Sequence, residues 1–369
     1  MKRYLSVAFA IALPALLALG LAQVSLAKDL PEPRSGEIRF EVTDKEPQVA
    51  EMYHLAPHTF TFKQEFQKTS FKAFDVSLVT FPSPVKTAHE VNNTVHCEYF
   101  RPLSPGKHPA VVVLHILGGD FELSRTFCKH MAQNGISALF LKLPYYGERR
   151  PQGINKRMIS DDPVETIASM RQGVLDIRRA AAFLAGQPEV DPEQLGIFGI
   201  SLGGITSALA STAEPRFGKV CMMLAGGDMA QIAWESPEVK DVRERWIAKG
   251  ATKEQFYESL KCIDPVTYAK NVHGRKLLML NANQDEVIPK SCTIALWKAF
   301  GEPEIVWYDA GHYSAVRFIF DALGRATKFF QPEQASEKAA AAEKAPTSAT
   351  TATLVKPVAN EPAASSSKK

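Results

Sequence analysis

Cysteine is scarce in this chain, and its spacing excludes the common zinc-binding knuckles. The 369 residues contain five cysteines, and no two of them form a Cys-x-x-Cys pair. Pairs at that spacing supply ligands to many structural zinc sites, so we expect neither a metal site nor a metal cofactor. The odd number leaves at least one thiol unpaired, and Cys262 with Cys292 is the first pair to test for a disulfide.

A large net charge of either sign is also missing. The 43 Lys and Arg residues nearly balance the 40 Asp and Glu residues, which gives a formal net charge of +3 at pH 7. The chain has no basic stripe with interleaved aromatic residues, so we expect no nucleic-acid partner. Apolar residues make up 45% of the chain, which is ordinary for a globular protein and sufficient for a substantial core.

Acidic residues are absent from the first 27 positions. Lys2 and Arg3 precede an apolar run over residues 4–22, and small residues occupy the −3 and −1 positions of a cleavage site after Ala27. This pattern predicts a signal peptide over residues 1–27 and a secreted or periplasmic protein. An uncleaved membrane anchor, with the protein facing outward, is the alternative because the run approaches the length that spans a bilayer.

Four segments follow the leader. Residues 28–59 are rich in proline and charge and are expected to form a loosely packed lead-in, while the Ala-, Lys- and Pro-rich residues 331–369 predict a disordered tail. Residues 60–330 begin with antiparallel strands and then alternate short apolar strands with helices. That alternation predicts an α/β domain with a mostly parallel sheet covered by helices on both faces. An amphipathic helical insertion over residues 228–272 is either a lid or a displaced crossover helix.

The segment Gly199-Ile200-Ser201-Leu202-Gly203 joins an apolar strand to a helix. A Gly-x-Ser-x-Gly turn in this context presents its serine to substrate, and the flanking glycines let strand and helix approach closely. Ser201 is therefore the predicted nucleophile.

A serine hydroxyl needs a base, and the base needs a carboxylate that orients it. Asp285 lies five residues beyond the apolar strand that ends at Leu280, and His312 lies just beyond the strand that ends at Tyr308. Catalytic residues of parallel sheets lie at the carboxyl ends of the strands. The predicted triad is therefore Ser201, Asp285 and His312.

Three further residues could take two of these roles. Glu286 and Asp228 could replace Asp285 as the acid, and His273 is the main rival of His312 as the base.

The order nucleophile, acid, histidine resembles the α/β-hydrolase superfamily. The loop over residues 115–120 looks like the superfamily's His-Gly oxyanion loop, with Ile116 where glycine is usual. Within the superfamily, residues 70–330 look most similar to exported serine esterases of the dienelactone-hydrolase and acetyl-xylan-esterase kinds. The resemblance implies the α/β-hydrolase fold. The turn geometry then predicts an oxyanion hole formed by the backbone N–H groups of Leu202 and Leu117.

Tyr145 and Tyr146 follow the strand that ends at Leu143, so they are expected at the active edge of the sheet. We expect these tyrosines and Ile116 to line the substrate pocket. A structural loop, with its shape held by arginine–glutamate pairs, is the alternative interpretation.

These observations predict an exported serine hydrolase that acts without a cofactor. A carboxylesterase that cleaves small or carbohydrate-linked acyl esters fits best, with a small-molecule or polysaccharide-linked ester as its substrate. A lipid acyl hydrolase, a peptidase and a non-catalytic surface binding protein are the alternatives on the same fold.

Overall fold

A computed structural model of the protein describes residues 31–250 and 252–332. The expected signal peptide and nearly all of the expected tail lie outside these described residues. Within them, no helix combines the length and the apolar character needed to cross a membrane.

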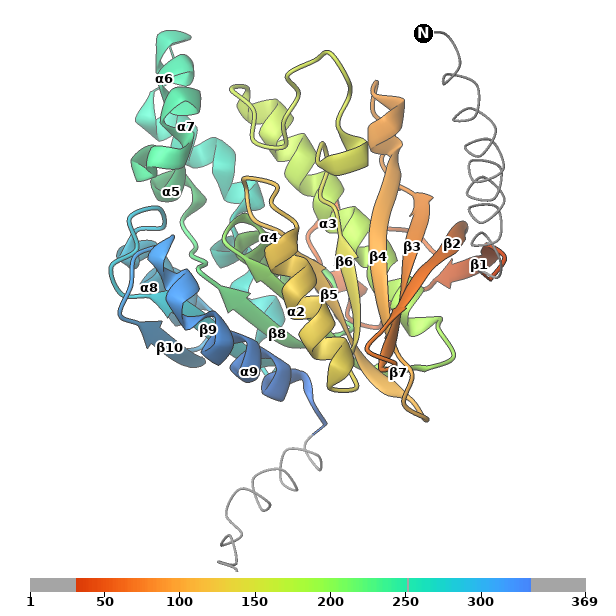
Figure 1. Cartoon of the computed structure of the whole chain (residues 1–369). Coiled ribbons are helices and arrows are strands. Elements are labelled where there is room, and N and C mark those ends of the chain that lie inside the picture. Colours follow the sequence, from red (N-terminus) through yellow and green to blue (C-terminus); the bar gives the residue numbers. More distant parts are fainter. Residues whose placement is uncertain (1–30, 251, 333–369) are drawn as a thin grey trace, which may run out of the picture. The chain divides into compact units, whose positions relative to one another are not determined.

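Ten strands form one sheet in the order β1-β2-β3-β4-β6-β5-β7-β8-β9-β10. From β6 to the β10 edge of this order, adjacent strands run parallel. From β1 to β6, adjacent strands run antiparallel. The predicted fold class is confirmed by this sheet (Figure 1). The strands are β1 (Arg34–Phe40), β2 (His58–Ser70), β3 (Phe74–Pro82), β4 (Thr94–Pro102), β5 (His108–Leu114), β6 (Ser137–Leu141), β7 (Val190–Ile200), β8 (Phe217–Met223), β9 (Lys276–Ala282) and β10 (Glu304–Tyr308).

The expectation of a loose lead-in over residues 28–59 is wrong for much of that segment. β1 pairs with β2 along its whole length, and Ile38 and Phe40 are buried in the core. Tyr53 is also fully buried, and its hydroxyl donates to the carbonyl oxygen of Cys262 at 2.8 Å. The alternating apolar side chains of β1 are a strand signal, which the surrounding prolines and charges obscured.

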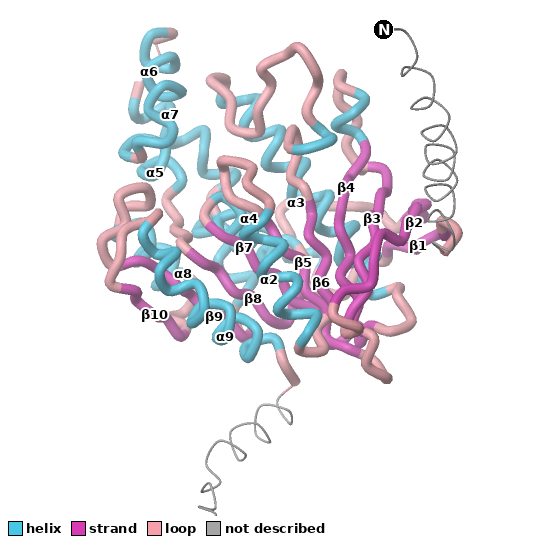
Figure 2. The backbone as a smooth tube through the Cα atoms, in the orientation of Figure 1, coloured by secondary structure: helices cyan, strands magenta, loops and turns pink. Residues whose placement is uncertain are grey.

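Helices cover both faces of the sheet (Figures 1 and 2). Side chains of α3 and α4 pack on one face with Val112 and Leu114 of β5, and those of α2 and α9 pack on the other face with Val111 and Val113. Successive side chains of a strand point to opposite faces of the sheet. The fully buried strand β5 therefore contributes apolar residues to the core on each face. The α-helices outside the insertion, among the described residues, are α2 (Glu122–Gln133), α3 (Pro163–Ala185), α4 (Leu202–Ala213), α8 (Lys290–Ala299) and α9 (Ile319–Phe330). The short 3-10 helices there are η1 (Glu46–Gln48), η2 (Glu51–Tyr53), η3 (Glu90–Asn93), η4 (Gly147–Arg149) and η8 (Ser314–Phe318).

The segment over residues 228–272 folds into several short helices rather than one crossover helix. Its α-helices gather beyond the carboxyl ends of the parallel strands (Figure 1). Trp246 and Phe256 pack edge to face with ring centroids 4.3 Å apart, and Trp234 meets Phe256 at 5.8 Å. These helices are α5 (Met229–Glu235), η5 (Pro237–Val239), α6 (Lys240–Ala248), α7 (Lys253–Leu260), η6 (Lys261–Ile263) and η7 (Pro265–Val272).

All five cysteines are free thiols, so the structure contains no disulfide between Cys262 and Cys292. The Cys262 thiol instead donates to the carbonyl oxygen of Ser259 at 3.3 Å. Cys292 is fully buried in the first turn of α8.

Candidate active site

The turn between β7 and α4 holds Ser201 in a backbone conformation that residues with side chains rarely adopt. Its φ is 55° and its ψ is −116°. The Ser201 N–H donates to the carbonyl oxygen of Met223 on β8 at 2.9 Å, which ties the turn to the neighbouring strand. Strained dihedrals of this kind persist where surrounding structure enforces them, and they concentrate at functional sites.

Three glycines make this turn sterically possible. A Cβ on Gly199 would lie 2.1 Å from the carbonyl oxygen of Gly203, and a Cβ on Gly203 would lie 2.7 Å from that of Leu114. A Cβ on Gly204 would lie 2.7 Å from the carbonyl oxygen of Met223. The sequence identified the first two close approaches, but the third depends on β8 and became visible only in the structure.

The three residues of the predicted triad form a continuous chain of hydrogen bonds. His312 Nε2 lies 2.9 Å from Ser201 Oγ, and His312 Nδ1 lies 2.8 Å from Asp285 Oδ2. The Asp285 side chain is only 2% exposed and that of His312 only 8%. This geometry lets the imidazole accept the serine proton while the carboxylate holds its tautomer and stabilises its positive charge.

Backbone amides hold Asp285 in place. Its Oδ1 accepts the N–H of Val287 at 2.9 Å and that of Ile288 at 2.8 Å. The neighbouring Glu286 accepts the backbone N–H of His312 at 2.8 Å through Oε2, rather than a ring N–H. Glu286 therefore positions the histidine backbone, and Asp285 contacts the imidazole.

Asp228 and His273 form hydrogen bonds away from the triad. Asp228 accepts the N–H of Gln231 and caps α5. His273 contacts the carbonyl oxygen of Ala299 through Nε2 at 3.2 Å. The structure therefore assigns neither residue a catalytic role.

The loop after β5 is anchored by a fully buried histidine. His115 Nδ1 lies 2.8 Å from the carbonyl oxygen of Ile116, and His115 Nε2 lies 3.1 Å from the Leu143 nitrogen. A carbonyl oxygen can only accept and a backbone N–H can only donate, so the ring is neutral with its proton on Nδ1. Burial lowers the pKa of His115 to about 4, which keeps it neutral.

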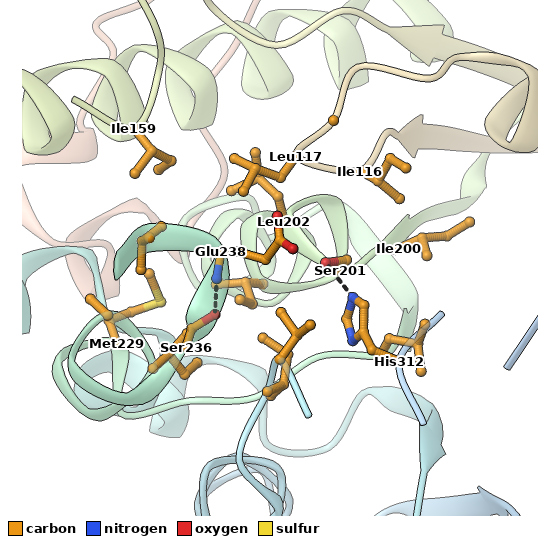
Figure 3. Close-up of a pocket in the computed structure, with 18 of the residues that line it drawn as sticks. Ile116, Leu117, Ile159, Ile200, Ser201, Leu202, Met229, Ser236, Glu238 and His312 are labelled. Atoms are coloured by element: carbon orange, nitrogen blue, oxygen red, sulfur yellow. Dashed lines mark hydrogen bonds between the residues drawn. The ribbon is translucent and has the colours of Figure 1, made fainter. Parts of the chain in front are cut away.

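This anchoring sets the direction of the next N–H group. A trans peptide places its C=O and N–H on opposite sides, so the Ile116 carbonyl directed at the ring turns the Leu117 N–H away from His115. Leu117 and Leu202 both line the cavity that contains Ser201, on the other side of the serine from His312 (Figure 3). Leu202 opens α4, where a backbone N–H has no partner within the helix.

The expected pocket tyrosines do not line the cavity, and one of them, Tyr146, packs behind this loop. Ile116 lines the cavity as predicted, but Tyr145 and Tyr146 do not. The Tyr146 hydroxyl donates to the carbonyl oxygen of Leu117 at 2.8 Å, and its ring packs against His115 with centroids 4.4 Å apart. Burial raises the pKa of Tyr146 to about 12, so the hydroxyl stays a donor.

Buried charge fixes the loop that carries these tyrosines. Arg149 is fully buried and pairs with Asp176 at 2.7 Å, while also donating to the carbonyl oxygens of Lys142 and Asn92. This supports the structural interpretation of the loop, with one change. Arg149 pairs with an aspartate of α3, whereas Glu148 pairs with Lys142.

The residues described contain no group of three or more His, Cys, Asp or Glu side chains placed to hold a metal ion. Two features of the site escaped sequence reasoning, namely the His115 anchor and the Tyr146 hydroxyl. Both are contacts between segments about 30 residues apart, and residue type alone does not reveal them.

Two segments of this chain match known protein families. Residues 49–231 match the family described as alpha/beta hydrolase domain containing 18, and residues 170–313 match the prolyl oligopeptidase family. The chain is a member of the α/β-hydrolase superfamily. The two matched segments together include Ser201, Asp285 and His312, and they support hydrolase chemistry.

Solved structures share the fold. An acetyl xylan esterase from Paenibacillus sp. R4 is 23% identical with a TM-score of 0.59, over 72% of this chain and 88% of that one. Acetyl xylan esterase 1 from Thermoanaerobacterium sp. JW/SL YS485 is 20% identical with a TM-score of 0.55, over 70% and 87% of the two chains.

Curated relatives match a smaller share of this chain. An uncharacterized protein of Mycobacterium tuberculosis is 25% identical over 184 residues, which are 48% of this chain and 42% of the relative. A second one is 25% identical over 236 residues, which are 62% and 72% of the two chains. The chain thus spans less than half the length of the first of these relatives.

Proposed function

We propose that this hydrolase is a serine carboxylesterase. The observation that carries the proposal is the unbroken hydrogen-bond chain from Ser201 through His312 to Asp285, which opens into a cavity. A nucleophile, a base and an orienting acid in this arrangement are the groups that acyl transfer requires.

The reaction follows from the roles of these groups. Ser201 Oγ attacks the ester carbonyl and forms a bond to its carbon, while His312 Nε2 takes the hydroxyl proton. The oxyanion that forms accepts hydrogen bonds from the N–H groups of Leu117 and Leu202. Collapse breaks the bond to the leaving alcohol, which takes its proton from His312. Water then attacks the acyl-enzyme with the same histidine as base, and releases the acid and free Ser201.

A peptidase is the second candidate, because residues 170–313 match the prolyl oligopeptidase family. Amide and ester substrates pass through the same kind of tetrahedral intermediate, so the hydrogen-bonded triad serves both. Parallel assays on p-nitrophenyl acetate and on peptide p-nitroanilides separate the two candidates.

Labelling with a fluorophosphonate probe tests the proposal. The wild type is expected to label stoichiometrically and to hydrolyse p-nitrophenyl acetate, and Ser201→Ala and His312→Ala are expected to do neither. Labelling that persists in Ser201→Ala would show a different nucleophile and contradict the proposal. An inert but folded wild type would also contradict it and would favour a non-catalytic binding protein.

We also propose export of the enzyme, on the basis of the leader over residues 1–27. Expression of the full chain in a bacterium with a periplasm, followed by N-terminal sequencing of the mature protein, is expected to give Lys28 as the first residue. An intact Met1 on a membrane-bound product would support the uncleaved anchor instead.

A further inference from the structure

The cavity beside Ser201 is larger than an acetyl group requires. Its volume is about 300 Å³. A water molecule, which is close to a methylene group in size, occupies about 30 Å³ of liquid. The cavity therefore has space for a chain of roughly eight to ten carbon atoms.

Its wall is almost entirely apolar, and much of that wall comes from the helical insertion. α5 contributes Met229 and Ile232, and deeper in the insertion Trp246, Phe256 and Leu260 are all buried. Burial of an aliphatic chain against such a surface is favourable in proportion to the area removed from water.

Most of the few polar side chains of the wall are already hydrogen-bonded within the protein. Apart from Ser201, His312 and the buried indole N–H of Trp246, which has no partner among the described residues, each has at least one hydrogen-bond partner. The pairs are Ser160 with Glu165, Thr166 with the Ser160 carbonyl oxygen, Ser236 with the Glu238 N–H, Glu238 with the Tyr313 hydroxyl, and Arg243 with the Trp234 carbonyl oxygen. A sugar hydroxyl buried here would lose its water partners and gain few in return, which is unfavourable.

The position of His312 assigns the cavity to the acyl side of the ester. His312 protonates the leaving alcohol, so the alcohol lies near the imidazole. There the neighbouring Tyr313 is 60% exposed, which gives the alcohol a route to solvent. Met229 and Ile159 lie across Ser201 from His312 (Figure 3). Much of the apolar wall thus lies away from the leaving group, and the cavity also reaches Tyr313, Val316 and Ile319, which follow His312 in the chain.

We infer that this enzyme is selective for esters of unbranched aliphatic acids of medium chain length, with the acyl chain bound between the oxyanion loop and helices α5 to α7. The inference rests on the proposed function, and it replaces the small or carbohydrate-linked acyl group expected from the sequence.

The test is a kcat/KM series on p-nitrophenyl esters from acetate to hexadecanoate, each below its micellar concentration. Each added methylene is expected to raise kcat/KM by up to about fourfold. The rise should stop near eight to ten carbons, where the cavity is full. A parallel series of alkyl acetates, with the alcohol lengthened instead, is expected to stay within a few-fold of ethyl acetate.

Two cavity-filling variants test where the acyl chain of the substrate binds. Ala233 on α5 and Val242 on α6 line the cavity, so Ala233→Phe and Val242→Phe should each lower the ratio of decanoate to acetate kcat/KM at least tenfold. Ala248→Phe is the matched control, because Ala248 is exposed on the same insertion and does not line the cavity. It should leave the ratio unchanged.

The outcomes distinguish the two proposals. Acetate hydrolysis that depends on Ser201 but falls with acyl length would overturn the chain-length inference and leave the esterase intact. A rise in the alkyl acetate series alone would place the chain on the alcohol side and overturn it as well. Turnover of no ester, with no Ser201-dependent labelling, would instead contradict the proposed function.

Discussion

His115 Nδ1 donates to the carbonyl oxygen of Ile116 at 2.8 Å, and this contact orients the peptide whose N–H belongs to Leu117. Ile116 also accepts the N–H of Gly119 at 3.3 Å, so its carbonyl is held by two donors. The usual glycine of the superfamily is absent at position 116, yet the loop keeps a defined peptide orientation. The hydrogen bonds of the buried His115 ring, rather than the conformational freedom of a glycine, set this peptide orientation.

Removal of this anchor should impair the chemical step. In His115→Phe the ring keeps its bulk but loses both hydrogen bonds, so the Leu117 N–H is no longer held in place. Because loss of one oxyanion donor costs about 10²- to 10³-fold in kcat, we expect a fall in kcat of up to about 10²-fold with little change in KM. Steady-state kinetics on p-nitrophenyl acetate measure both constants.

His130→Phe is the matched control for this experiment. His130 is a half-buried histidine on α2 that bonds Thr327, and it does not line the cavity. Its kcat should remain within a few-fold of wild type. A His115→Phe enzyme with unchanged kcat, or with the loss confined to KM, would show that the ring does not position an oxyanion donor.

The same histidine should make stability depend on pH. Burial lowers the pKa of His115 from 6.5 to about 4. The unfolded chain therefore binds more protons than the folded chain between these pH values. The contribution of neutral His115 to the free energy of unfolding is thus complete above pH 6.5 and is lost as the pH falls towards 4. The full shift corresponds to ~3 kcal/mol.

Urea denaturation at pH 7 and pH 4 measures this effect as a difference. The wild type should lose more unfolding free energy over that interval than His115→Phe, by an amount on the order of 3 kcal/mol. Burial also lowers the pKa values of His96 and His130, but both residues are present in the two proteins and cancel. Equal losses in the two proteins would contradict the assignment.

Substitution of Asp285 should lower kcat far more than substitution of Glu286. Asp285→Asn removes the carboxylate that holds the His312 tautomer, which should lower kcat by about 10⁴-fold. Glu286→Gln retains an oxygen that can accept the His312 backbone N–H, so a loss below tenfold is expected. Comparable losses in the two variants would show that the acid has been misassigned.

The tight turn predicts a steric penalty at Gly199. Gly199→Ala places a methyl group within 2.1 Å of the Gly203 carbonyl oxygen, so the strand or helix must shift. Overpacking of this kind costs about 1–3 kcal/mol or more. Gly218→Ala on β8 is the control, because its nearest neighbour would be 3.9 Å away. Thermal unfolding should show a lower Tm for the first variant only, and equal Tm values would refute the steric argument.

Much of the fold could be predicted from the sequence because its signals are local. The apolar strands between helices and the Gly-x-Ser-x-Gly turn are each contained within about 20 residues, and the structure has them where they were expected. β1 was missed, since seven residues of weak alternation among prolines and charges carry little information until β2 lies beside them.

The sequence by itself determined the superfamily order of Ser201, Asp285 and His312, because each follows a strand whose carboxyl end meets the same edge of a parallel sheet. Only the tertiary structure decided that Asp285 rather than Glu286 contacts the imidazole, and that Tyr146 lies behind the oxyanion loop. It also decided the apolar cavity, whose wall comes from segments more than 200 residues apart. The direction in which each of two adjacent carboxylates points, and the distance between side chains far apart in the sequence, are set only when the chain folds.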